Sequence, residues 1–277
     1  MWHGWVMDIA RPERIRLLGV EVDLVTPGEM LGELDGFIAE GRCAVIANHN
    51  AHSLYLCRRQ PELKAFFETA DLIEIDSRPM IAWGRLLGLP VSPRHRCTYL
   101  DWRDEFWRLA KARGWRVFYL GGAPGVPERA AERLRAQWPG LKLGVHHGYF
   151  DREGPANAEV IATIQAFEPD IVLVGMGMPL QEAWIHANRS AFSRGVFFSL
   201  GAAFDYEAGV QHAAPRWLGR LGLEWLYRLA TQPTRLAFRY LVEPWFLLPA
   251  MLDDLAARRR GEFDAPGRAV GAGTTPH

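Results

Sequence analysis

The 277-residue chain has few cysteines and no excess of charge of either sign. Its three cysteines, Cys43, Cys57 and Cys97, are far apart and form no CxxC pair, which argues against a disulfide framework and favours a reducing cytosol. Basic and acidic residues number 32 each, whereas a general nucleic-acid binder needs a basic excess. We therefore expect no nucleic-acid partner.

Long apolar runs are also missing. No run of about 18 uncharged apolar residues occurs, so the sequence predicts no transmembrane helix. The N-terminus lacks the basic segment followed by an apolar one that is typical of a secretory signal. We expect a protein that is soluble or lies on a membrane without crossing it.

Motifs for metals and common cofactors are absent as well. The sequence has no DxD triplet and no HExxH, and the pair His146-His147 has no metal-ligand spacing to other histidines or cysteines. The segment LGGAPG at 120–125 is neither GxGxxG nor a P-loop, which argues against a dinucleotide-dependent oxidoreductase. We predict no metal site and no cofactor.

What the sequence does contain is a regular alternation of strand and helix patterns, in a chain that is 49% hydrophobic. Apolar runs that end in polar residues or glycine predict strands at 43–48, 71–76, 115–122, 141–150, 171–177 and 195–204. Helical spacing predicts helices at 61–70, 100–114, 126–140, 157–170 and 181–192. This alternation indicates an α/β fold, with a Rossmann-like, mostly parallel sheet and helices on both faces.

The pattern changes after residue 212. Helical spacing replaces the strands, aromatic residues alternate with arginine, and residues 216–260 contain eight arginines and four acidic residues. We predict an α/β core at 1–212, a C-terminal helical appendage at 213–260 and a disordered tail at 261–277.

Candidate site residues follow the predicted strands, because ligands of open parallel sheets bind beyond the carboxyl ends of the strands. Glycines there let a phosphate or sugar approach backbone N–H groups, and a following helix N-terminus favours an anion. The residues are Asn48, Asn50, Asp76, Gly121, Gly122, Gly175, Gly177, Gln181 and Glu182. Each has a structural alternative: the glycines can form tight turns, Asp76 can be a helix N-cap, and the Gln181-Glu182 pair can cap a helix. The residues alone indicate a site for a phosphorylated ligand.

Several segments resemble the WecG/TagA/CpsF glycosyltransferases, glycosyltransferase family 26. The resemblance covers roughly residues 18–245, and its most specific parts are GMGMPLQEAWI at 175–185 and GLEWLYRL at 222–229. Among the subgroups, NHNAHSLYL, IDSRPMIAWGRLLGLP and LVEPW are most similar to the exopolysaccharide branch that includes the xanthan-type enzyme GumM.

The resemblance implies an inverting, metal-independent transferase. Such enzymes move a sugar from a UDP-activated donor to the 4-hydroxyl of a sugar carried on undecaprenyl diphosphate. Carried over by position, the family's catalytic Asp falls on Asp76, with Asn48 and Gln181 as further catalytic positions. Asn50, the glycines and Glu182 then line the substrate-binding site, and arginines of the appendage also bind the substrate. These are Arg228, Arg235 and Arg239.

Two departures from the family pattern bear on the donor sugar. Ser77 replaces the usual glycine after the aspartate, and Asn48 replaces a threonine. With the exopolysaccharide resemblance, these favour a hexose donor such as UDP-glucose, used in assembling an exopolysaccharide repeat unit. The alternatives are UDP-N-acetylmannosamine or its uronic acid as donor, and a non-catalytic binding component of the polysaccharide machinery.

The appendage is expected to bind the membrane surface and to close the site, because the acceptor's lipid tail stays in the bilayer. Amphipathic aromatic residues and nearby arginines favour the membrane surface. The aromatic residues are Trp217, Trp225, Tyr227, Trp245 and Phe246. This implies a peripheral protein on the cytoplasmic face of the bacterial inner membrane. A plain helical cap over the sheet, or a subunit interface in a homo-oligomer, is the alternative.

Overall fold

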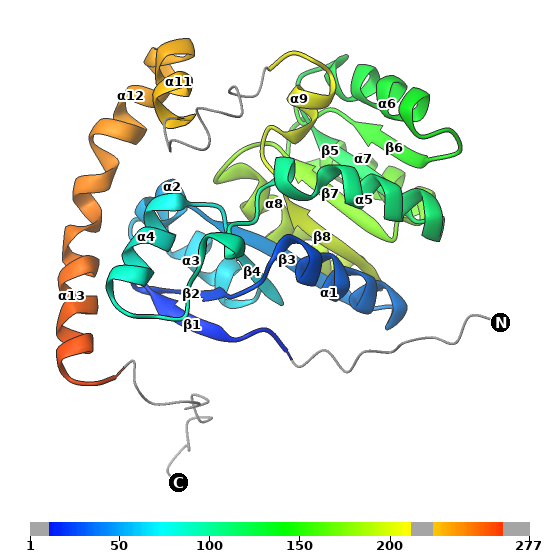
Figure 1. Ribbon diagram of the computed structural model, residues 1–277. Helices are drawn as coiled ribbons and strands as arrows, with labels where there is room; N and C mark the ends of the chain where they lie inside the picture. The colour runs from blue at the N-terminus through cyan, green and yellow to red at the C-terminus, as the bar shows by residue number, and fades with distance from the viewer. Residues whose placement is uncertain (1–10, 212–223, 263–277) are drawn as a thin grey trace, which may run out of the picture.

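A computed structural model describes residues 11–211 and 224–262, and its centre is a six-stranded sheet (Figure 1). All described pairings in this sheet are parallel, in the order β4-β3-β8-β7-β5-β6. The strands are β3 (Cys43–His49), β4 (Leu72–Ile75), β5 (Arg116–Gly121), β6 (Lys142–His146), β7 (Ile171–Gly175) and β8 (Gly195–Ser199). The order in which the chain passes through the strands changes direction within the sheet. Ligands of open parallel sheets bind at such a point.

Helices cover both faces of the sheet (Figure 1). One face packs against α1 (Pro27–Ala39), α5 (Tyr99–Arg113), α6 (Val126–Gln137) and α9 (Ala203–Glu207). The other face packs against α2 (Ala51–Cys57), α3 (Pro61–Glu68), α4 (Arg78–Leu86), α7 (Gly154–Phe167) and α8 (Leu180–Asn188). The short 3₁₀ helices η1 (Pro93–His95) and η2 (Arg189–Ala191) lie in connections.

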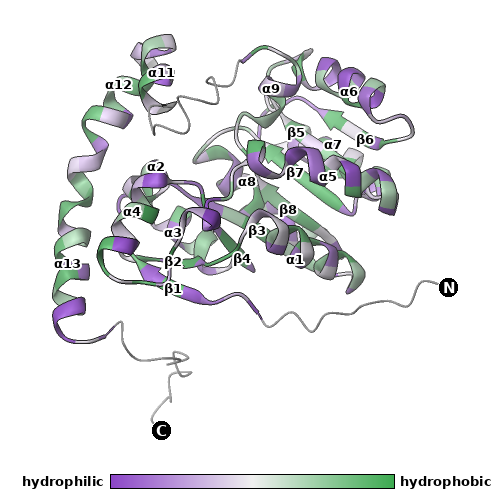
Figure 2. Ribbon diagram, in the orientation of Figure 1, coloured by the Kyte–Doolittle hydropathy of each residue, from purple (hydrophilic) through white to green (hydrophobic). Residues whose placement is uncertain are grey.

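The strands are apolar on both faces, as strands buried between two helical layers must be. In β5, Val117 and Tyr119 belong to one buried cluster, whereas Phe118 and Leu120 belong to the other. Figure 2 shows the same arrangement as hydrophobic strands inside helices with hydrophilic outer residues. The near-continuous apolar runs of the sequence are therefore explained by the two layers.

A small antiparallel hairpin precedes the sheet and was not predicted. It consists of β1 (Arg14–Leu17) and β2 (Val20–Asp23). The buried Asp23 accepts hydrogen bonds from Arg14 Nε at 2.8 Å and from the backbone N–H of Ile73 in β4 at 2.7 Å. The second bond joins the hairpin to the edge of the main sheet.

The C-terminal helices lie along one side of the core (Figure 1). They are α11 (Glu224–Thr231), α12 (Pro233–Leu241), the 3₁₀ helix η3 (Glu243–Leu247) and α13 (Leu248–Arg259). Leu247 and Ala250 join a buried cluster of the core. Asp254 accepts hydrogen bonds from the Leu18 backbone N–H and from Trp83 Nε1, both at 2.9 Å. The end of the appendage is thus fastened to the core.

The predicted fold class is confirmed, including the C-terminal helices. Each strand predicted between residues 43 and 204 is present, with bounds shifted by a few residues. The predicted boundary at 212/213 and nearly all of the predicted tail lie outside the described residues, so both stay predictions.

Candidate active site

The predicted site residues lie at the carboxyl edge of the sheet, where the loops enter the helices. Asn48 and Asp76 come from the neighbouring strands β3 and β4 on one side of the sheet. Gly121 and Gly175 end the paired strands β5 and β7 on the other side. The strand β8 lies between the two groups. The edge therefore has an acidic side and a glycine-rich side.

Asp76 directly follows β4 and is half-buried. Its backbone N–H donates to the His49 carbonyl at 2.9 Å, which continues the pairing of β4 with β3 by one residue. The N-cap of α4 is Ser77, whose Oγ accepts from the Met80 N–H. The alternative that Asp76 is merely the N-cap of this helix is therefore wrong.

Glu74, two residues before Asp76, is fully buried. Its Oε1 has no hydrogen-bond partner among the described residues. Burial, and then the nearby charge of Asp76, raise the pKa of Glu74 well above its usual value. The raised pKa favours the neutral form of Glu74, so the surroundings of Asp76 disfavour a second negative charge.

The two asparagines hold the loops on the acidic side. Asn48 Nδ2 donates to the Ser199 carbonyl at 2.7 Å and so ties the end of β3 to the end of β8. Asn50 is the N-cap of α2, because its Oδ1 accepts from the N–H groups of His52 and Ser53. Both side chains are half-buried and contribute to the shape of the edge.

The glycines on the other side serve two purposes. A Cβ on Gly121 would lie 2.3 Å from the Gly175 carbonyl oxygen, and one on Gly175 would lie 2.3 Å from the Tyr119 hydroxyl. These two residues are therefore glycine because the backbone and Tyr119 are close-packed there. Gly122 and Gly177 have positive φ of 71° and 81°, which favours glycine in a turn. A Cβ on Gly177 would meet no atom of the described residues within 4 Å, so among these residues the loop faces open space.

Gln181 joins two of these loops. Its Oε1 accepts from the N–H groups of Gly177 at 3.1 Å and Gly201 at 3.0 Å, after β7 and β8 respectively. Its Nε2 donates to Glu182 Oε1 at 2.7 Å. Since Gln181 is only 1% exposed and its amide is occupied by these contacts, the geometry favours a positioning role over direct contact with a substrate.

Glu182 supports Gln181 from within the core. It is fully buried, and its Oε2 has no hydrogen-bond partner in the part of the chain that the structure describes. Burial raises the pKa of Glu182 to about 7, against the opposing effect of the bond from Gln181. This geometry favours a supporting role for Glu182 over the predicted contact with the substrate, which stays a prediction.

Two appendage arginines reach the core. Arg228 donates to the Tyr206 hydroxyl on α9, and Arg239 donates to Asn50 Oδ1 at 3.4 Å. Nearby, His52 Nδ1 and the buried Glu243 carboxylate lie 2.8 Å apart, which links α2 to η3. The side chain of Arg235 lies outside the described residues. The appendage therefore contacts the acidic side of the edge through Arg239.

The family model "Glycosyl transferase WecG/TagA/CpsF family" matches residues 15–261, which is most of the chain. The chain belongs to this glycosyltransferase family. It is similar to proteins of Staphylococcus aureus strains MRSA252 and NCTC 8325 / PS 47, which are named N-acetylglucosaminyldiphosphoundecaprenol N-acetyl-beta-D-mannosaminyltransferase. Each is 29% identical over 233 residues, covering 80% of this chain and 87% of the relative.

Membership in the WecG/TagA/CpsF family confirms the resemblance and makes the protein an enzyme, a glycosyltransferase. The names of the relatives agree better with the alternative donor, N-acetylmannosamine, than with the expected hexose. The resemblance to the exopolysaccharide branch stays a prediction.

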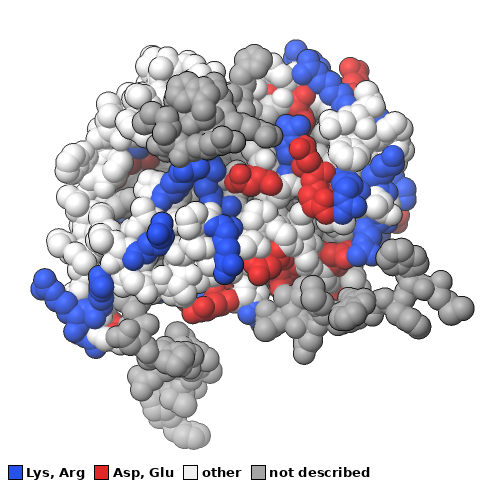
Figure 3. Space-filling model, in the orientation of Figure 1, with Lys and Arg blue, Asp and Glu red and all other residues white. Residues whose placement is uncertain are grey.

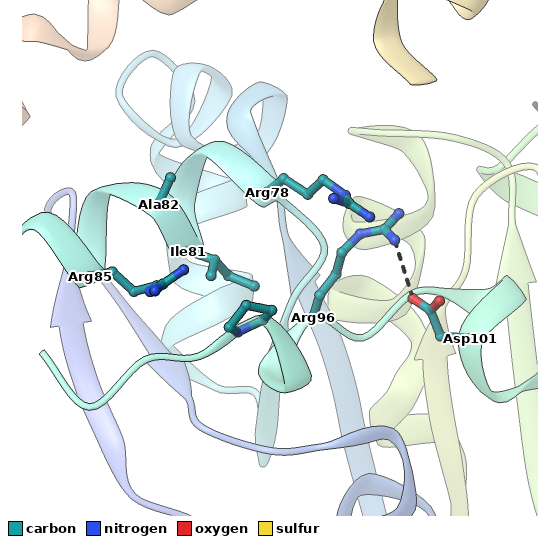
Figure 4. A pocket seen from close by; sticks show the side chains of 7 residues that line it. Arg78, Ile81, Ala82, Arg85, Arg96 and Asp101 are labelled. Carbon is teal, nitrogen blue, oxygen red and sulfur yellow. Dashed lines mark ion pairs between the residues drawn. The ribbon is translucent and has the colours of Figure 1, made fainter. Parts of the chain in front are cut away.

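A cavity that lies against α4, the helix that follows Asp76, was not predicted from the sequence. It has a volume of about 380 Å³, and its lining includes Arg78, Arg85, Arg96 and Asp101 (Figure 4). Arg78 could have been noticed, since it follows Asp76 by two residues. Arg96 is brought there by a parallel bridge to Ile75, which no local pattern indicates.

The described residues offer neither a metal site nor a membrane-spanning helix. They contain no group of three histidines, cysteines or acidic residues that could hold a metal ion. No described helix is long and apolar enough to cross a membrane.

Proposed function

We propose that the protein transfers N-acetylmannosamine from UDP-N-acetylmannosamine to the 4-hydroxyl of N-acetylglucosamine on undecaprenyl diphosphate, with inversion. The names of the two Staphylococcus aureus relatives support this sugar and this acceptor. A hexose donor such as UDP-glucose is the second candidate, and Ser77 in the place of the usual glycine favours it.

One observation carries the proposal of a catalytic base. Asp76 is half-buried at the carboxyl end of β4, and Ser77, not Asp76, is the N-cap of α4. A carboxylate at this edge can accept a proton from a bound hydroxyl group. Such general base catalysis typically contributes about 10²- to 10⁴-fold to the rate.

In the proposed reaction, the acceptor O4 attacks C1 of the donor sugar while Asp76 takes the hydroxyl proton. The C1–O4 bond forms, the bond from C1 to the phosphate oxygen breaks, and UDP leaves from the opposite side, which inverts the configuration at C1. The glycine loops after β5, β7 and β8 are the proposed donor side, since the open turn at Gly177 leaves room for a ligand beside backbone N–H groups. Gln181 and Glu182 would hold these loops in position.

The appendage is proposed to bring the site to the membrane surface. Its described helices expose several large apolar side chains: Trp225, Leu226, Phe238, Leu241, Trp245, Phe246, Leu248 and Leu252. Exposed apolar groups on amphipathic helices favour the interface between lipid headgroups and acyl chains. The expected position on the cytoplasmic face of the inner membrane belongs to this proposal.

The experiment is a donor screen with a lipid-linked acceptor. Purified protein is incubated with undecaprenyl-diphosphate-linked N-acetylglucosamine and, in turn, with UDP-N-acetylmannosamine, its uronic acid, UDP-glucose and UDP-N-acetylglucosamine. We expect acceptor-dependent UDP release and a disaccharide product with UDP-N-acetylmannosamine. Release with UDP-glucose alone would favour the second candidate, and no release with any donor would favour a non-catalytic component. Repeating the active reaction in EDTA, with and without added magnesium, checks the prediction that no metal is needed.

A further inference from the structure

The arginine cavity against α4 has the features of an anion site. Arg78 is the first residue of α4, and Arg85 lies two turns further along the same helix. In Figure 4, Arg78 and Arg96 extend toward one another, and Arg96 is paired with Asp101 at 3.6 Å. In Figure 3, blue side chains gather over α4 and the segment after it, with acidic side chains beside them.

The charges in this cavity are not balanced by its own lining. Three arginines and one aspartate are among the lining residues. Within 11–211 and 224–262, no carboxylate is paired with Arg78 or Arg85. Neighbouring guanidinium groups, such as those of Arg78 and Arg96, bind phosphate with short, charge-assisted hydrogen bonds, often two at a time. The N-terminus of α4 adds a partial positive charge at Arg78.

The position of the cavity identifies which phosphate it fits. Cys97 N–H donates to the Ile75 carbonyl at 3.0 Å, so Arg96 lies beside the last residue of β4. The residues that line the cavity lie between Arg78 and Asp101, directly after β4, which is the edge strand and is separated from β8, β7 and β5 by β3. The glycine loops of the proposed donor side follow those three strands.

The stereochemistry of the proposed transfer also places the acceptor diphosphate on the Asp76 side of the reacting centre. UDP leaves from the face of the donor opposite to the attacking O4, so the donor diphosphate lies on the far side of the reacting centre from Asp76. The acceptor sugar has its O4 at Asp76 and its own diphosphate on C1, across the ring. That second diphosphate therefore lies on the Asp76 side, away from the UDP.

We infer that Arg78, Arg85 and Arg96 form the binding site for the diphosphate of the polyprenyl-linked acceptor. This inference rests on the proposed function, since it takes Asp76 as the base for that acceptor. Binding the diphosphate there would orient the sugar with its 4-hydroxyl at Asp76. Arg78 carries the most weight, because it lies nearest to Asp76 in the chain and has no described role in the fold.

The test compares Arg78→Gln with Arg94→Gln. Arg94 is an exposed arginine of η1 that does not line the cavity, so it controls for the loss of one positive charge. Kinetics are measured with a short-chain prenyl diphosphate-linked N-acetylglucosamine, which is soluble without a bilayer. We expect Arg78→Gln to raise the KM for this acceptor about tenfold, with the KM for the UDP-sugar unchanged. Arg94→Gln should change neither KM.

A binding experiment separates this inference from the proposed function. Calorimetry with inorganic pyrophosphate, in the presence of saturating UDP, should detect a site in the wild-type protein and in Arg94→Gln that is lost in Arg78→Gln. If no UDP-sugar is a donor, the proposed function fails, and this measurement still decides whether the cavity binds a diphosphate.

Three results would overturn the inference. One is an Arg78→Gln variant that raises the KM for the UDP-sugar instead of that for the acceptor. Another is unchanged binding of pyrophosphate and of the short-chain acceptor. The third concerns lipid headgroups: if Arg78→Gln weakens binding to phosphatidylglycerol vesicles but not to the short-chain acceptor, the cavity binds lipid phosphates.

Discussion

The α/β core and the C-terminal appendage differ in where they place the tryptophans that the structure describes. In the core, Trp102, Trp107 and Trp184 are almost fully buried. In the appendage, Trp225 and Trp245 are 43% and 68% exposed. A monomeric soluble protein rarely exposes many large apolar groups together, and such groups mark surfaces that bind something.

Polar contacts hold the appendage against the core, so the exposure of its tryptophans is not the result of poor packing. The buried Glu243 pairs with His52, and the buried Asp254 binds Leu18 and Trp83. The appendage is therefore held in place by specific polar contacts while its apolar side chains face outward. We propose that the core carries out the chemistry and that the appendage binds a surface, and the following predictions test this division.

The largest effect is expected from Asp76→Asn. This change removes the proposed base and keeps the size of the side chain, so kcat should fall by about 10²- to 10⁴-fold. The free energy of unfolding should hardly change, because Ser77 and not Asp76 caps α4. Steady-state rates of UDP release and urea unfolding measure the two quantities. Near wild-type turnover in a well-folded variant would remove Asp76 from the mechanism.

Replacing Glu182 by Gln should make the free energy of unfolding less dependent on pH. Burial raises the pKa of Glu182 from 4.5 to about 7. Below pH 4.5 the folded and unfolded states are both protonated. Between pH 4.5 and 7 only the unfolded state ionises, so the free energy of unfolding falls as pH rises, by about 3 kcal/mol in total.

Glu182→Gln removes this dependence and keeps the acceptor for Gln181. The variant should therefore become more stable relative to the wild type as pH rises from 5 to 8. Urea unfolding at both pH values measures the difference, with Glu159→Gln on the exposed side of α7 as the control. A difference that does not change with pH would contradict the assignment.

Asp254→Ala should loosen the appendage. It leaves the buried Leu18 N–H and the Trp83 Nε1–H without their acceptor, which costs about 2–3 kcal/mol. Thermal or urea unfolding checks this, and the exposed neighbour Asp253→Ala is the matched control. An equal effect of the two substitutions would mean that Asp254 does not fasten α13.

The sequence predicted the main sheet well because its strands are buried on both faces. Their apolar runs are almost uninterrupted, and each ends in a polar residue or glycine. The hairpin at 14–23 was missed since β1, RIRL, alternates charged and apolar residues and depends on contacts with Asp23 and β4. Local pattern does not contain that information.

The candidate site was predicted in part for a related reason. Strand ends located Asp76 and the glycines, but the sequence DSRP did not reveal whether Asp76 or Ser77 caps α4, since both residue types are good N-caps. Likewise, the bonds from Gly177 and Gly201 to Gln181 depend on two loops that are adjacent only in the folded sheet.

The division between core and appendage is tested most directly by measuring transfer to two acceptors. One is the undecaprenyl-linked sugar in anionic vesicles, and the other is its short-chain soluble analogue. Asp76→Asn should lower both rates. The double variant Leu241→Ser/Trp245→Ser removes two exposed apolar groups of the appendage. It should lower the vesicle rate about tenfold and leave the soluble rate unchanged.

Leu86→Ser, which removes an exposed apolar residue of the core, is the control and should change neither rate. A double variant that keeps its full rate on vesicles, or that loses both rates equally, would contradict the account.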